Sequence, residues 1–324
     1  MRSPHRSVLL AAAAAAFVSG CGSGGKSAPP PTPQPSAPVQ DFPAAAGNTM
    51  GQLQQKYGEG PIFAPSVSLL DPGTNRMGFA LFDRARKQIT GAGVALYVAR
   101  IDGTHLRGPF VARTETLAVK PQFESRTTAS DPNAAKGVYV ANLPLPKKGK
   151  YALLGVARID GRLTTTNAYS AEVGSKGATP PRAGQKAIRI HTPTVASVAG
   201  DSSKIDTRTP PAPDLQQVDF ASVLGKKPVV LMFATPQLCQ SRVCGPVVDI
   251  EEQVKSAVGN KVAFVHMEIY NQNDVSKGFR PQVAAYHLPT EPWTFVIDRT
   301  GRIATRFEGA VSAGELQRAV AKVE

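Results

Sequence analysis

Two cysteines lie five positions apart in the C-terminal third of the chain, at Cys239 and Cys244. A continuous apolar run, Val229 to Phe233, precedes them, and its β-branched composition predicts a buried strand. After them, apolar residues recur at helical spacing from Val247 to Val258, with charged residues around them. The amides and partial positive charge of a helix N-terminus stabilise a thiolate, which is the reactive form of cysteine. The pattern therefore predicts a pair of thiols placed where thiol chemistry is possible.

The spacing of the pair restricts where the two cysteines can lie. In a regular helix, a separation of five residues leaves the Cα atoms beyond the ~7 Å limit for a disulfide. We therefore expect Cys239 in a loop ahead of the helix, or an irregular first helical turn. Cys239 should be the more exposed thiol and the nucleophile, and Cys244 the resolving thiol. Arg242 between them either favours the thiolate through its charge or only solvates the turn.

The third cysteine, Cys21, ends a segment with the anatomy of a secretory signal. Arg2 and Arg6 form a positive start, and an apolar run of eleven residues follows, too short to span a bilayer. The run ends in Val18-Ser19-Gly20-Cys21, which resembles the lipobox of bacterial lipoproteins. That resemblance implies a signal peptide over 1–20, a lipid on Cys21 and a cell-membrane location on the extracytoplasmic face. In an oxidising compartment, the two remaining cysteines are expected to pair.

The length of the chain and its charge limit the number of domains and the classes of partner. A chain of 324 residues suggests more than one domain. The formal charge is +13, but the basic residues are scattered and lack interleaved aromatic residues. A nucleic-acid partner is therefore not expected.

The first half of the chain divides by composition. Residues 21–58 are rich in Gly, Ser, Pro and Ala and predict a flexible tether. Residues 59–173 contain short β runs separated by turns such as Asp102-Gly103 and Asp160-Gly161, without an amphipathic helix. This pattern predicts an antiparallel β-sandwich, similar in general shape to immunoglobulin-like modules.

A second Gly/Pro/Lys-rich stretch, 174–187, predicts a linker between independently folded parts. From 188 to 324 the elements alternate as βαβ and then continue as a hairpin and a helix. This order predicts an α/β domain with a mixed sheet.

The C-terminal part resembles the thioredoxin fold, especially the TlpA-like and copper-chaperone-like thioredoxins of bacterial envelopes. Three landmarks carry the resemblance: the strand that leads into the cysteine turn, Pro246 early in the following helix, and the proline-then-strand segment Leu288 to Asp298. The resemblance implies that Pro292 follows a cis peptide bond and faces the dithiol. It also implies that the backbone at Glu291 and Pro292 binds a substrate chain by strand addition.

The sequence departs from this family in two places. The family's active turn is usually CxxC, whereas four residues separate Cys239 from Cys244. Met232 stands about where thioredoxins bury an acidic residue that aids proton transfer.

Three functions remain open. The first is a thiol–disulfide oxidoreductase or redox partner of exported protein thiols and disulfides, which needs no cofactor. The second is copper(I) handling by Cys239 and Cys244 with a histidine, His266 or else His287. The third is a non-catalytic binding module in which the disulfide only fixes a loop.

Overall fold

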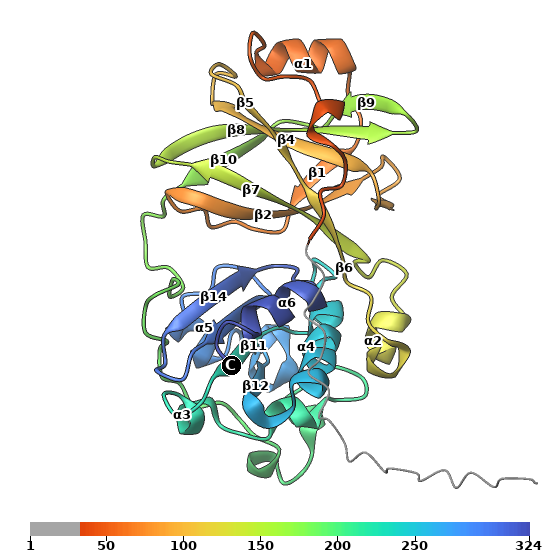
Figure 1. Ribbon diagram of the computed structural model, residues 1–324. Helices are drawn as coiled ribbons and strands as arrows, with labels where there is room; N and C mark the ends of the chain where they lie inside the picture. Colours follow the sequence, from red (N-terminus) through yellow and green to blue (C-terminus); the bar gives the residue numbers. More distant parts are fainter. Residues whose placement is uncertain (1–32) are drawn as a thin grey trace, which may run out of the picture.

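The computed structural model describes residues 33–324, which form an antiparallel β part and an α/β part stacked on one another (Figure 1). The predicted signal peptide and the expected lipidation site, Cys21, lie outside the described residues. Within 33–324, no helix combines the length and the apolar character needed to cross a membrane.

Two antiparallel sheets form the first part. One has the strand order β1-β2-β7-β6, with β3 paired to β2, and the other has the order β10-β8-β4-β5, with β9 paired to β8. The strands are β1 (Ile62–Pro65), β2 (Gly73–Phe82), β3 (Gln88–Ile89), β4 (Gly93–Arg100), β5 (Arg107–Val111), β6 (Arg113–Thr116), β7 (Gly137–Leu145), β8 (Gly149–Ile159), β9 (Arg162–Thr165) and β10 (Tyr169–Val173). The predicted antiparallel sheets are confirmed.

The core of this part lies between the two sheets. Phe79 of β2, Tyr139 of β7, Leu96 of β4 and Leu153 of β8 belong to one buried cluster. Alternate residues of antiparallel strands face the same side, so each sheet contributes one apolar face to this layer.

The last part of the segment expected to be a flexible tether is folded onto the β part. Residues 33–58 include helix α1 (Met50–Tyr57), which begins at a capping box between Thr49 and Gln52. Phe42 and Leu53 are buried against the outer face of the β10-β8-β4-β5 sheet in a cluster with Tyr97. These apolar side chains anchor the segment although its composition resembles that of a linker.

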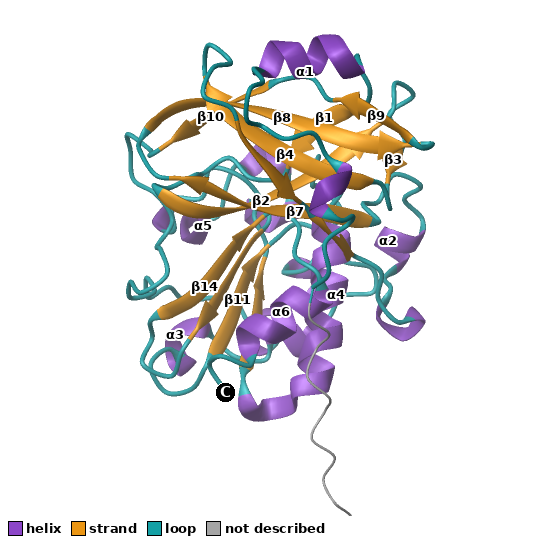
Figure 2. Cartoon of the chain, turned by 45° about the horizontal axis from the view of Figure 1, so that its top comes forward, coloured by secondary structure: helices purple, strands orange, loops and turns teal. Residues whose placement is uncertain are grey.

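The α/β part is built on a four-stranded sheet of order β12-β11-β13-β14. Strand β11 is parallel to β12 and antiparallel to β13, and β13 is antiparallel to β14. The elements are α3 (Phe220–Val223), β11 (Val229–Phe233), α4 (Cys244–Val258), β12 (Ala263–Met267), α5 (Pro281–Ala285), β13 (Trp293–Ile297), β14 (Ile303–Glu308) and α6 (Ala313–Val320). A βαβ unit followed by a hairpin and a helix is the expected thioredoxin-like arrangement, which is confirmed. Figure 2 shows β11 and β14 of this sheet together with α4 and α6.

The two parts pack against one another, and their independent folding stays a prediction. Leu117, Val138 and Val140 of the β part share one buried cluster with residues of α4 and α6. Residues of the linker are also held in place, because Arg182 pairs with Asp71 at 2.7 Å. The shared cluster means that each part buries some of its apolar surface against the other.

Candidate active site

Cys239 and Cys244 form a disulfide with a Cα–Cα distance of 6.0 Å. Cys244 is the first residue of α4, and Cys239 lies in the loop between β11 and this helix, as the spacing required. Cys239 is 7% exposed and Cys244 is 0% exposed, so the order of exposure agrees with the prediction although both are buried. Once reduced, both thiols would lie within reach of the α4 N-terminus, where amides stabilise a thiolate.

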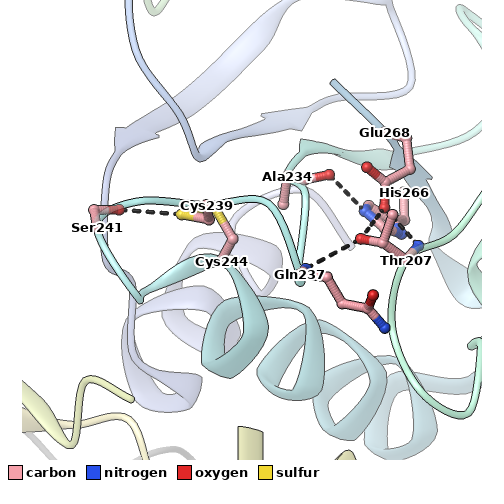
Figure 3. Close-up of a disulfide and its surroundings, with 8 residues drawn as sticks. All are labelled: Thr207, Ala234, Gln237, Cys239, Ser241, Cys244, His266 and Glu268. Atoms are coloured by element: carbon pink, nitrogen blue, oxygen red, sulfur yellow. Dashed lines mark hydrogen bonds between the residues drawn. A yellow bond between two sulfur atoms is a disulfide. The ribbon is translucent and has the colours of Figure 1, made fainter. Parts of the chain in front are cut away.

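The loop reverses direction just before the helix. Arg242 adopts a left-handed conformation with φ of 59°, which turns the chain from Cys239 toward Cys244. The hydroxyl of Ser241 lies 3.1 Å from Cys239 Sγ (Figure 3). Helix α4 then runs through Pro246, whose missing N–H is tolerated in a first helical turn.

A cleft of about 960 Å³ opens beside the disulfide loop, between the two parts of the molecule. One wall consists of Gln237, Cys239 and Arg242, and the other of residues from the β part that include Thr128 and Asp131. This second wall is the connection between β6 and β7, which contains the short helix α2 (Arg126–Ala129). Figure 1 shows α2 lying away from the sandwich, beside α4. The β part therefore contributes directly to the surroundings of the disulfide.

The connection is fixed to the cysteine loop by direct contacts. Arg242 Nη1 lies 2.8 Å from Asp131 Oδ2, and the backbone N–H of Ala135 donates to the carbonyl of Arg242. A Cβ added at Gly245 would lie 3.0 Å from Thr128 Oγ1, so the close approach of α2 favours glycine at this position.

A buried ion pair also fixes the α2 connection in place. Arg208 Nε lies 2.8 Å from Asp249 Oδ1, and the two side chains are 5% and 0% exposed. The other oxygen of Asp249 accepts from the backbone N–H and the hydroxyl of Ser125, the N-cap of α2. Arg208 also donates to the carbonyl of Phe123. Helix α4, the segment around Arg208 and the α2 connection thus meet at one hydrogen-bonded centre.

In the connection between α5 and β13, the Glu291–Pro292 peptide bond is cis, as the family resemblance implied. A carboxylate oxygen of Glu291 and the sulfur atoms of Cys239 and Cys244 all lie within 4.8 Å of one another. Burial raises the pKa of Glu291 to about 7, and the nearby carboxylate of Glu268 adds to the shift. Glu291, the first residue of the expected substrate-binding pair, therefore lies next to the disulfide with its carboxylate near the sulfurs.

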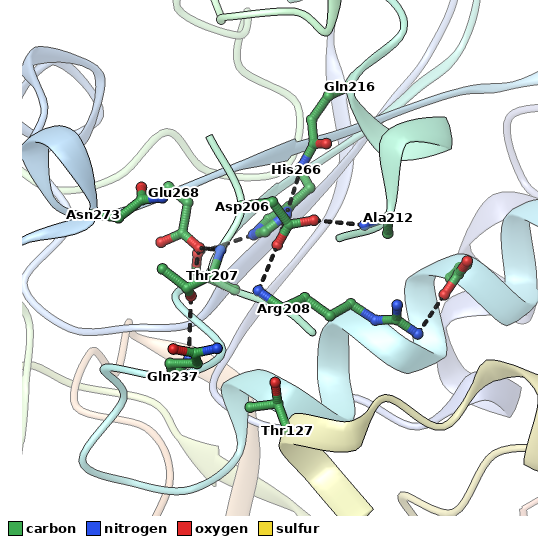
Figure 4. Close-up of polar contacts among 12 residues, drawn as sticks. Thr127, Asp206, Thr207, Arg208, Ala212, Gln216, Gln237, His266, Glu268 and Asn273 are labelled. Atoms are coloured by element: carbon green, nitrogen blue, oxygen red, sulfur yellow. Dashed lines mark hydrogen bonds and ion pairs between the residues drawn. The ribbon is translucent and has the colours of Figure 1, made fainter. Parts of the chain in front are cut away.

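His266 does not join the cysteines. Its Nε2 lies 3.0 Å from the carbonyl oxygen of Ala234, and its Nδ1 lies 3.2 Å from the amide nitrogen of Gln216. Its potential metal-ligating neighbours are Asp206 and Glu268, as Figure 4 shows. His287 belongs to no group of potential ligands in the described part of the chain. The geometry gives no support to a site made of two thiolates and His266.

The sequence did not indicate two contributions to this site. Ser241 had no pattern of its own, and the α2 connection is distant in sequence from the cysteines. Asp249, one of the charged residues around the apolar stripe of α4, is completely buried. Only the contact between the two parts of the molecule makes these roles visible.

Comparison with solved structures adds a distant likeness. The chain is 17% identical to a thiol:disulfide interchange protein of the thioredoxin family from Chlorobium tepidum TLS, with a TM-score of 0.29. The alignment covers 46% of this chain and 99% of that structure. No family model matches the chain, and no curated protein matches it either. At this identity and score nothing is transferred from that protein, and the thioredoxin-like fold is established by the strand order and directions of the β12-β11-β13-β14 sheet.

Proposed function

We propose that this protein is a membrane-anchored, extracytoplasmic thiol–disulfide oxidoreductase or redox partner that uses Cys239 and Cys244. The observation that carries the proposal is a disulfide at the N-terminus of α4 whose first cysteine lines an open cleft. A purely structural disulfide needs no such access.

In the exchange, the thiolate of Cys239 attacks one sulfur of a substrate disulfide. A mixed disulfide forms, and the other substrate sulfur leaves as a thiolate that takes up a proton. The thiol of Cys244 then loses its proton and attacks Cys239 Sγ, which forms the internal disulfide and releases the second substrate thiolate. The substrate gains two electrons and two protons, and the protein dithiol is oxidised. Run in reverse, the same steps oxidise a substrate dithiol.

The substrate would be an exported protein. An extended segment would pair with the backbone at Glu291 and Pro292 by strand addition, next to the sulfurs. The lipid on Cys21 remains a proposal that rests on the lipobox-like sequence, and it would hold the site at the membrane surface.

We also propose an immunoglobulin-like assignment for the β part. The orders β1-β2-β7-β6 and β10-β8-β4-β5 support it, because they match strands A-B-E-D and G-F-C-C′ of that fold. In this proposal the sandwich is an accessory domain that supplies one wall of the cleft through the α2 connection.

The second candidate is a non-catalytic binding module. The low exposure of both cysteines favours it, since a buried disulfide resists attack.

Trapping with single cysteine variants separates the two functions. Cys244→Ser should accumulate mixed disulfides through Cys239, because no resolving thiol remains, and Cys239→Ser should accumulate none. Non-reducing electrophoresis of membrane extracts would detect the adducts. If both variants trap nothing and the wild-type disulfide survives a glutathione-level reductant, the binding module is the correct function.

The anchor is tested separately by the intact mass of the mature chain. The membrane fraction should contain a chain that begins at Cys21 and carries lipid. An unmodified chain in the soluble fraction would show that the lipobox interpretation is wrong.

A further inference from the structure

The proposed exchange leaves one proton without an acceptor. Cys244 is 0% exposed, so bulk water does not reach its sulfur when it must act as a nucleophile. The buried side chains clustered with Cys244, which include Met232 and Val247, are apolar and cannot take a proton. A dithiol of this kind needs another base nearby.

The carboxylate of Glu291 is close enough to serve. One of its oxygens lies within 4.8 Å of both sulfurs, and the side chain is only partly buried. Among residues 33–324, no protein hydrogen-bond donor or cation is paired with this carboxylate, whose half-buried position leaves it free to change its protonation. Glu315, in contrast, binds two guanidinium groups. The carboxylate of Glu291 is therefore available to the thiols.

The surroundings of Glu291 set its proton affinity. The titratable groups that act on it are the two thiols, Glu268 at the end of β12 and Tyr270 beyond it. Glu268 is a like charge and is itself buried, so it disfavours the ionised form of Glu291. A base that is half protonated near neutral pH is well matched to accepting and returning a thiol proton.

We propose that the Glu291 carboxylate accepts the proton from Cys244 as this thiol resolves the mixed disulfide on Cys239, and that it returns a proton to this sulfur in the reverse direction. The role rests on the proposed exchange function. In the forward step the S–H bond of Cys244 breaks, its proton moves to a Glu291 oxygen, and the S–S bond to Cys239 forms while the substrate thiolate leaves. Glu291 then gives up the proton to the departing thiolate or to solvent.

The resolving step can be measured by itself on the full chain. The reduced protein is mixed with glutathione disulfide and quenched in acid at intervals, and the mixed disulfide and the internal disulfide are separated by mass. Wild type should resolve faster as the pH rises through about 7, where Glu291 becomes a carboxylate. Glu291→Gln should resolve about 100-fold more slowly at pH 7 and lose this inflection, since a general base contributes 10² or more. Glu291→Asp should recover part of the rate, and the exposed control Glu172→Gln should behave as wild type.

This experiment distinguishes failure of the Glu291 role from failure of the exchange function. If wild type forms mixed disulfides and Glu291→Gln resolves them at the wild-type rate over the whole pH range, the role of Glu291 is overturned while the exchange function stands. If wild type forms none, the exchange function fails. In that case the thiolate absorbance of the reduced chain still tests the pairing: removal of the Glu291 charge should make thiolate appear at lower pH, because a nearby like charge disfavours it. Identical titrations of wild type and Glu291→Gln would then refute the pairing.

Discussion

Acidic side chains are buried in two different ways in this molecule. At the boundary between the two parts, arginines neutralise them: Glu315 of α6 lies 2.7 Å from Arg76 and 2.6 Å from Arg113. Two other acidic side chains, the buried Glu251 of α4 and the half-buried Glu291, have no cation at hydrogen-bonding distance in the described part of the chain. Both oxygens of Glu251 lack any hydrogen-bond partner, and Glu291 faces the sulfurs.

The two environments shift the proton affinity in opposite directions. Burial would raise the pKa of Glu315, but the guanidinium groups of Arg76 and Arg113 hold it below its usual value. Burial raises the pKa of Glu251 well above its usual value, and the charge of Asp206 raises it further. Paired acids therefore fasten the two parts together, whereas the unpaired acids Glu251 and Glu291 hold protons more readily than an ordinary glutamate. Three substitutions test this difference.

The largest effect is expected from Arg208→Met. The substitution leaves the fully buried carboxylate of Asp249 without its cation, and breaking a buried ion pair in this way costs about 3–5 kcal/mol. The midpoint of urea unfolding should fall accordingly. Arg84→Met, on an exposed turn, is the matched control and should change stability by less than about 0.5 kcal/mol. An unchanged midpoint for Arg208→Met would mean that this pair does not hold the α2 connection.

A smaller loss is expected from Glu315→Gln, which removes charge-assisted hydrogen bonds to Arg76 and Arg113. The expected loss is about 1.5–3 kcal/mol at pH 7. Because folding lowers the pKa of Glu315, the wild-type advantage is complete above the ordinary value of 4.5 and disappears as the pH falls through the folded-state value. Urea unfolding of both proteins from pH 7 down to pH 3 would follow it. A difference that grows toward low pH would contradict the pairing.

The smallest change, and one of opposite sign, is expected from Glu251→Gln. Because folding raises the pKa of Glu251, wild type loses stability as the pH rises above the ordinary value of 4.5, while glutamine cannot ionise. The variant should be more stable by on the order of 1 kcal/mol at pH 8 and equal to wild type below pH 4.5. Thermal unfolding at these two pH values would measure the difference. A variant that is less stable at pH 8 would show that the Glu251 carboxylate has a partner.

Local patterns in the sequence predicted the elements around the disulfide well. The β-branched run at 229–233 formed β11, the stripe from Val247 to Val258 formed the buried face of α4, and the five-residue spacing placed Cys239 in a loop. Each of these features depends on residues close together in the chain, where periodicity and steric limits apply.

Features that depend on long-range contact were not predicted. Asp249 and Glu251 alternate with apolar residues on α4, and the local pattern does not indicate that both are fully buried. The α2 connection and the segment around Arg208 pack on this side of α4. The spacing of apolar residues within a helix cannot show which distant segments of the chain will pack on it. Likewise, two large apolar residues, Phe42 and Leu53, did not suffice to predict that their Pro- and Ala-rich segment packs on the sheet.

The α2 connection has a consequence for how such a protein could be rearranged by recombination. The wall opposite Cys239 is encoded more than a hundred residues earlier, inside the β part, between β6 and β7. Exchange of the whole sandwich for another of the same fold would remove one wall of the cleft, together with the apolar contacts that α4 and α6 make with the β part. The two domains are therefore not interchangeable modules, and a working hybrid would have to carry the β6–β7 insertion along with the cysteines.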